Sequence, residues 1–224
     1  MTDLVLASDE DNGKVSKALA KTAEQLRKGL VAFVEDGAGP ITGSAAYASD
    51  RLERVGETEK AIQRVVRETV ASAGAAGFVT GLGGFATMPI TLPANLAGAA
   101  LLNARMVGAI AHLRGYDLRD PIVQQLLLLV VAGESANAAM RDVGIKVGKK
   151  FAERGVERIS VETIRKINQK VGFMLLAKYG TKRSAVTLIK IVPFVGGVVG
   201  GTVDATFTKA VATAAKKAFP ADGK

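Results

Sequence analysis

The feature that most constrains this chain is a run of 36 residues, 69–104, that contains no charged side chain. A single uninterrupted helix of this length would be long enough to cross a bilayer. Gly and Pro interrupt the segment 77–93, however, and each lowers the stability of a helix interior, by about 1 kcal/mol for Gly and about 3 kcal/mol for Pro. We therefore predict a helix, a sharp turn around residues 88–93, and a new helix from about Ala94 to Arg114 with Pro93 in its first turn.

Apolar residues recur at helical spacing through much of the remaining chain. Between Lys14 and Glu35 they stand three or four residues apart, which places them on one face of a helix. A second helical stretch runs from about residue 44 to residue 72, and Gly56 is positioned to divide it. Almost half of the chain (48%) is hydrophobic but only 5% is aromatic, which is typical of helices packed through small side chains rather than of β-sandwiches. The sequence therefore predicts an all-α fold, a compact multi-helix bundle whose apolar helices are broken by Gly and Pro.

The chain is predicted to form one domain. Residues 1–13 are polar and acidic, and we expect them to be a disordered tail ahead of a single helical domain at residues 14–220. The N-terminus has no basic segment followed by a long apolar one, so a secretory signal peptide is not expected. The absence of cysteine excludes disulfides and thiolate metal sites and fits a reducing compartment. We therefore expect a cytoplasmic protein.

Residues 122–132 are apolar on all sides, so the helix that they form is buried in a bundle or faces lipid. Asp117 or Asp120 is placed to cap this helix, and Pro121 is placed to occupy its first turn. With fewer than 18 residues, the segment is too short to span a bilayer alone.

Two apolar segments rich in Gly and Pro, 77–93 and 191–201, are expected to lie together within the domain. Neither is a phosphate-binding loop, because no Gly-Lys-Ser/Thr follows the first and no strand is predicted before the second. Close helix packing explains these glycines better, since those of residues 196–201 form pairs four residues apart. A last helix is expected from about Val203 to Phe219. We predict no nucleotide, no other cofactor and no metal.

Positive charge is concentrated in the C-terminal part of the chain. Residues 1–140 carry 13 Lys and Arg against 15 Asp and Glu, whereas residues 141–224 carry 17 against 6. Such a basic half indicates either an anionic partner or a solubilising surface. Nucleic acid is not an expected partner, because the aromatic residues and motifs that accompany basic residues in such proteins are missing.

Four cations share one face of the basic amphipathic stretch at residues 141–158. We predict that this face contacts anionic lipid headgroups, with an ordinary solvated surface helix as the alternative. The four residues are Lys146, Lys149, Lys150 and Arg154.

His112 is the only histidine of the chain. With Asp117 nearby in sequence it forms a candidate polar site, to which we add Asp204, an acidic residue in an apolar stretch. No Ser or Cys nucleophile motif accompanies them, and one histidine does not make a usual metal site. A hydrogen bond at a helix end is the simpler role for His112, and complementing a helix dipole is the simpler role for Asp204. No residue is therefore assigned a catalytic function.

At residues 77–121 the chain resembles a known family. The stretch GFVTGLGGFATMPITLPANLAGAALLNARMVGAIAHLRGYDLRDP has two prolines in an apolar segment and a helix closing on Gly-Tyr-Asp, and it is similar to the central motif of the EcsC family of bacterial proteins. The segment IVPFVGGVVGGTVDATFTKAVATAAKKAF is similar to the C-terminal motif of that family. The resemblance covers the chain from about Ala61 onward. It implies an accessory protein encoded with an ABC transporter and linked to secretion and the membrane, and it implies no catalytic residues.

These observations predict a membrane-associated helical accessory protein that binds lipid or another apolar ligand. The expected partners are a lipid surface, on the inner face of the cytoplasmic membrane, and a membrane protein or transporter. One alternative is a protein–protein interaction module without a lipid ligand, and a less favoured one is a hydrolase that uses His112. The residues expected to contact the apolar ligand or the membrane come from the two segments rich in Gly and Pro: Phe85, Met88, Pro89, Leu92, Pro93 and Phe194.

Overall fold

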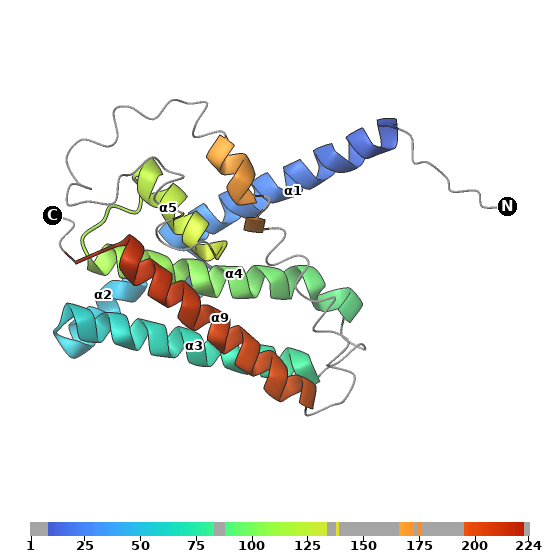
Figure 1. The fold of residues 1–224 in the computed structure, drawn as a ribbon. Coiled ribbons are helices and arrows are strands. Elements are labelled where there is room, and N and C mark those ends of the chain that lie inside the picture. Colours follow the sequence, from blue (N-terminus) through green and yellow to red (C-terminus); the bar gives the residue numbers. More distant parts are fainter. Residues whose placement is uncertain are drawn as a thin grey trace.

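The chain folds into a bundle of helices (Figure 1). The structure, a computed structural model, describes residues 9–82, 88–133, 138, 166–172, 174–175 and 195–221. Within this part of the chain the long elements are α1 (Asp9–Asp36), α2 (Ser44–Val55), α3 (Thr58–Leu82), α4 (Met88–Leu113), α5 (Pro121–Val131) and α9 (Val195–Ala218). The described residues include one short antiparallel strand pair, β1 (Gly37–Ala38) and β2 (Ile41–Thr42). The predicted all-α fold is confirmed.

Helix α1 begins at Asp9, earlier than the sequence predicts. The apolar spacing indicates a start near Lys14 and leaves residues 1–13 in a tail, so the prediction is wrong for residues 9–13. The acidic residues at positions 9–11 favour the longer helix, because carboxylates in a first turn stabilise the positive end of the helix dipole.

Two predicted helix ends are confirmed, and both carry a glycine in the left-handed region. Gly56 separates α2 from α3 with a φ of 70°, and its N–H donates to the carbonyl of Leu52 at 2.7 Å. Gly115, with a φ of 82°, follows α4. Residues with a side chain adopt this conformation only at a cost, which explains why Gly ends both helices.

The start of α5 matches the sequence prediction. The side chain of Asp120 accepts a hydrogen bond from the N–H of Ile122 at 2.7 Å, and Pro121 occupies the first turn. Every residue from Leu126 to Val131 is buried. The helix that is apolar on all sides therefore lies inside the bundle, as its composition requires.

The predicted turn at residues 88–93 is wrong, because α4 runs without a break from Met88 to Leu113. Pro89 is the second residue of this helix, where its missing N–H costs nothing. Pro93 removes only one intrahelical hydrogen bond, in the second turn. Pro89 therefore stands where a helix tolerates proline best, whereas Pro93, in the second turn, lowers the stability of the helix.

Helix α9 is also longer than predicted, since it begins at Val195 rather than near Val203. It lies beside α3 and runs in the opposite direction (Figure 1). A Cβ placed on Gly74 of α3 would lie 3.6 Å from the carbonyl oxygen of Gly201 and 3.7 Å from Cβ of Ala205. Small residues let these backbones approach closely, and the resulting packing offsets the low helix propensity of Gly. Helices α3 and α9, which carry described parts of the two apolar segments, therefore pack against each other, and the association of the segments themselves stays a prediction.

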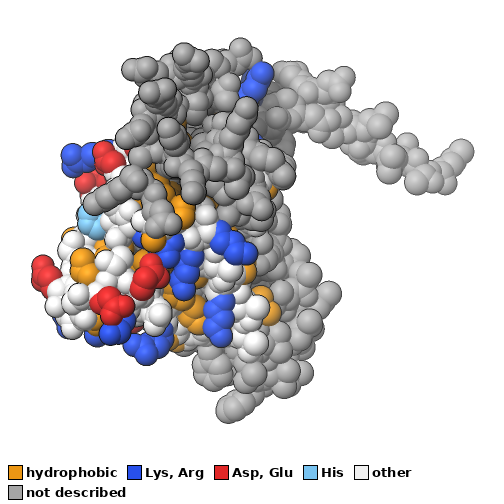
Figure 2. Space-filling view, turned by 60° about the vertical axis from the view of Figure 1, so that its left-hand side comes forward, with side chains coloured by type: hydrophobic (Ala, Val, Ile, Leu, Met, Phe, Trp, Pro, Cys, Tyr) orange, Lys and Arg blue, Asp and Glu red, His pale blue; other side chains and the backbone are white. Residues whose placement is uncertain are grey.

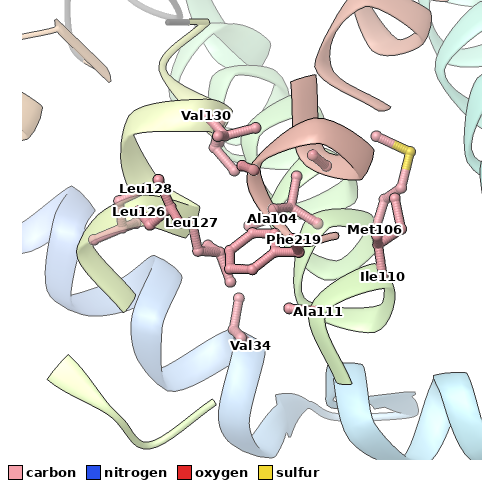
Figure 3. Close-up of a cluster of buried hydrophobic side chains, with 14 of the residues drawn as sticks. Val34, Ala104, Met106, Ile110, Ala111, Leu126, Leu127, Leu128, Val130 and Phe219 are labelled. Atoms are coloured by element: carbon pink, nitrogen blue, oxygen red, sulfur yellow. The ribbon is translucent and has the colours of Figure 1, made fainter. Parts of the chain in front are cut away.

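The hydrophobic core is built around the C-terminal end of α9. Phe219 is fully buried and lies among core side chains of α1, α4 and α5, including Val34, Ala111 and Leu127 (Figure 3). Its ring also meets that of Tyr116 edge to face, with the centroids 5.2 Å apart. The end of α9 is therefore anchored in the interior.

Candidate apolar contact site

Three helices bring their uncharged segments to the same end of the bundle. Residues 69–82 of α3, 88–104 of α4 and 195–203 of α9 contain no Asp, Glu, Lys or Arg. In Figure 1 the last turn of α3 and the first turns of α4 and α9 lie together at the right of the view. Because α4 and α9 run away from this end while α3 runs toward it, the three segments overlap along the axis of the bundle. We call this region the uncharged end.

Four of the six residues predicted to contact an apolar ligand or a membrane belong to the uncharged end. They occupy the first two turns of α4, and they are Met88, Pro89, Leu92 and Pro93. Phe85 and Phe194 lie outside the described residues. So do the four residues predicted to contact headgroups, Lys146, Lys149, Lys150 and Arg154. Their roles remain predictions.

The opposite end of the bundle carries charges of both signs. Figure 2, which brings this end forward, shows Lys, Arg, Asp and Glu side chains close together on the described surface. Its ion pairs include Arg54–Asp50 at 2.9 Å, Lys60–Glu57 at 2.7 Å and Arg114–Glu59 at 2.9 Å. Among the described residues of α3, α4 and α9, charged side chains therefore gather at one end, while the segments named above carry none at the other.

Glu68 ties α3 to α2 just before the uncharged segment of α3 begins, and Tyr47 extends this contact to α4. Its carboxylate accepts hydrogen bonds from the Tyr47 hydroxyl at 2.9 Å, from Arg51 at 2.8 Å and from Arg64 at 2.9 Å. The ring of Tyr47 lies between the guanidinium groups of Arg51 and Arg105, each 4.2 Å from the ring centroid. Burial opposes ionisation of Glu68, but the three donors outweigh it and hold the pKa of Glu68 at about 2. Burial and the bond to Glu68 raise the pKa of Tyr47.

We expect Glu68 to make the fold sensitive to acid. Because its pKa falls from 4.5 to about 2 on folding, the carboxylate contributes stability that is complete above the unfolded value and is lost as the pH drops toward the folded one. Glu68→Gln should therefore unfold at a lower urea concentration than the parent near neutral pH, at about pH 6, and this difference should shrink at about pH 3. Urea titrations at the two pH values measure the difference. An equal difference at both would contradict this account of Glu68.

Arg114 closes the charged end by holding the C-terminus of α9. Its Nη1 donates to the carbonyl oxygens of Lys216 at 2.7 Å and Phe219 at 2.6 Å, and its Nη2 donates to Oε1 of Glu59 at 2.9 Å. The last carbonyl groups of a helix have no intrahelical donor, so a cation there both satisfies them and complements the helix dipole. This contact, which we call the Arg114 clamp, fixes the ends of α3, α4 and α9 against one another.

The fold places Asp204 away from the other two residues of the candidate polar site. His112 is half-buried in the last turn of α4. Asp117 is exposed, and its Oδ1 accepts a hydrogen bond from the N–H of Arg119 at 2.9 Å. Asp204 lies twelve residues before Lys216, whose carbonyl belongs to the Arg114 clamp. Asp204 is therefore about 18 Å from the clamp along α9. This separation gives no support to a hydrolase built on His112 and Asp204.

Buried neutral polar residues were not singled out by sequence reasoning. Asn103 and Thr208 are each 1% exposed, and Gln125 is 5% exposed. Oδ1 of Asn103, Oγ1 of Thr208 and Oε1 of Gln125 have no hydrogen-bond partner in the described part of the chain. The sequence signal for them is weak, since it consists only of a neutral polar residue within an apolar helix face. Such atoms are rare in folded proteins and require an explanation.

Two kinds of feature are absent from the described residues. No group of three or more His, Asp or Glu side chains in these ranges is placed to hold a metal ion. None of the helices described is both long and apolar enough to cross a membrane.

Comparison with known proteins identifies a family over nearly the whole chain. The model of the EcsC protein family matches residues 9–220. No curated protein and no solved structure matches significantly.

Proposed function

The chain belongs to the EcsC protein family, and we propose that it is a membrane-associated helical protein that docks peripherally on lipid through its uncharged end. The observation that carries this proposal is the convergence of three uncharged helix segments, from α3, α4 and α9, at one end of the bundle. The family match by itself says nothing about lipid.

The physical argument rests on what a lipid surface accepts. A charged side chain at the centre of a bilayer costs about 2.5–3.5 kcal/mol on insertion scales, and an unpaired backbone group costs several kcal/mol more. The uncharged end has no charged side chain within the segments named above, and those segments are helical, so their backbone groups are paired except at the helix ends. Shallow insertion of this end, to a depth of about 5–10 Å, needs no helix that crosses the membrane.

Three cations lie near the limit of the uncharged segments, beside the acidic residues Glu68 and Asp204, and the two exposed ones, Arg67 and Lys209, support docking on anionic lipid. Arg67 of α3, Arg105 of α4 and Lys209 of α9 each lie eight to ten residues from the Arg114 clamp along their own helices. At about 1.5 Å per residue, all three stand within about one turn of the same level of the bundle. We call them the cationic belt. A Lys or Arg at headgroup level adds about 1 kcal/mol of attraction to an anionic surface.

The test is cosedimentation of the full chain with vesicles of phosphatidylcholine alone or mixed with phosphatidylglycerol, at low and high salt. We expect the parent to bind the anionic vesicles and to lose part of this binding at high salt. Met88→Asp combined with Leu92→Asp should weaken binding by roughly tenfold or more, because a carboxylate must then enter the apolar layer. Arg67→Glu combined with Lys209→Glu should weaken binding to anionic vesicles only.

The matched control is Ile41→Asp, which makes the same kind of change at an exposed apolar residue of β2. This variant should bind vesicles like the parent. If the parent is monodisperse and binds neither kind of vesicle, the proposal fails and a protein–protein interaction module is the remaining function. If Ile41→Asp weakens binding as much as the changes in α4, the uncharged end is not the contact surface.

A further inference from the structure

Two buried polar side chains lie on neighbouring helices, Asn103 on α4 and Thr208 on α9. Asn103 and Thr208 are each 1% exposed, and the described contacts leave Oδ1 of Asn103 and Oγ1 of Thr208 without a partner. The amide orientation of Asn103 is fixed, because its Nδ2 donates to the carbonyl of Ala99 at 3.0 Å. Its Oδ1 can therefore only accept a hydrogen bond, and satisfying it requires a donor from another residue, a water or a ligand.

The Arg114 clamp gives a common point from which the positions of the two residues along their helices are counted. Nη1 of Arg114 lies 2.6 Å from the carbonyl oxygen of Phe219. Asn103 precedes Arg114 by eleven residues and Thr208 precedes Phe219 by eleven, while α4 and α9 run in the same direction (Figure 1). Both residues are therefore about 16 Å from one common contact, measured along their helices.

The same count gives the direction in which the two side chains point. Eleven residues are close to three full turns, so Asn103 lies on the side of α4 that carries Arg114. By the same count Thr208 lies on the side of α9 that carries Phe219. Arg114 reaches toward α9, and Phe219 packs in the core beside α4 and α5 (Figure 3). Asn103 and Thr208 therefore both project into the interface.

We propose that Asn103 and Thr208 form an internal binding site for a hydroxyl group, held between α4 and α9 at the inner limit of the uncharged end. A hydroxyl donates to Oδ1 of Asn103 and accepts from, or donates to, Oγ1 of Thr208, so one O–H group satisfies both atoms. Its source is either an ordered water or the polar end of a single-chain lipid whose tail extends through the uncharged end. If the hydroxyl group comes from a lipid, the inference rests on the proposed function. The binding site between Asn103 and Thr208 does not depend on that function.

The test uses the full chain and two near-isosteric variants, Asn103→Leu and Thr208→Val. Thr213→Val is the matched control, because Thr213 is an exposed residue of the same helix. 1-Decanol serves as the lipid probe. If lipid supplies the hydroxyl, decanol raises the melting temperature of the parent and of Thr213→Val, and each site variant binds it about tenfold more weakly, as expected for one lost hydrogen bond. If water supplies it, decanol has no effect, and a high-resolution crystal structure shows one water bonded to both side chains.

The proposal is overturned if that crystal structure shows the two side chains bonded directly to each other, or both atoms dry, and decanol leaves the melting temperature unchanged. It is also overturned if the site variants and the parent bind decanol equally. Vesicle binding separates this result from the proposed function. Asn103→Leu changes a buried residue and should cosediment with anionic vesicles like the parent, whichever source fills the site.

Discussion

Phe219→Ala is expected to lower the free energy of unfolding by about 3–5 kcal/mol, the usual cost of removing a fully buried phenyl ring. The ring is completely inaccessible, and it packs against core residues of three other helices and against Tyr116. The cavity left behind would sit where α9 meets α4 and α5, among helices that close it only partly. Since small domains are stable by about 5–15 kcal/mol, the loss is a large share of the total.

Urea unfolding followed by circular dichroism measures this effect. Val203→Ala is the control, because Val203 is 37% exposed on the same helix. Its change in unfolding free energy should stay within about 0.5 kcal/mol. If the two variants unfolded at the same urea concentration, Phe219 would not be the centre of the core.

Arg114→Met is expected to cost a comparable amount, about 3–5 kcal/mol, through the loss of hydrogen bonds rather than of packing. The side chain of Arg114 is only 10% exposed, and it makes two bonds to carbonyl groups at the end of α9. Hydrogen bonds to a charged group contribute about 1.5–3 kcal/mol each, and methionine keeps much of the volume but no donor. Glu59→Gln should cost much less, because the side chain of Glu59 is 47% exposed and its ion pair is screened by water.

The same urea titrations test the Arg114 clamp. Arg67→Met is the control, since Arg67 is exposed on α3. Loss of the clamp should also raise the amide exchange rate in the last turn of α9 more than in α2, because the clamp holds that end directly. Uniform exchange changes across the bundle would show that Arg114 stabilises the fold globally and does not clamp α9 in particular.

Much of the fold could be predicted from local chemistry. Gly56, Asp120 and Gly115 mark helix ends because each meets a backbone requirement that can be read from a few neighbouring residues. The boundaries of α4 and α9 could not be predicted this way. Pro93 and the glycines of residues 196–201 disfavour helix on intrinsic propensity. For α9, close packing against α3, which is far away in sequence, opposes that propensity.

For the candidate site, the sequence predicts that the segments are uncharged but not that they meet in space. The absence of charge in residues 69–104 is plain in the sequence, but the meeting of this segment with residues 195–203 at one end depends on the antiparallel packing of α3 and α9. The pairing that we propose for Asn103 and Thr208 depends on the register between α4 and α9, which we count from the Arg114 clamp. No pattern within either helix alone predicts that register.

The central claim, that the uncharged end is the membrane-facing surface, is tested most directly by site-specific fluorescence. The chain has no Cys and no Trp, so a single cysteine carries an environment-sensitive label without competing sites or background emission. We expect labels at Leu92→Cys to shift to the blue when anionic vesicles are added, and to be quenched by brominated acyl chains. Labels at Lys60→Cys, in the charged end, should do neither. A shift and quenching at Lys60→Cys with none at Leu92→Cys, in a protein that binds the vesicles, would contradict the account.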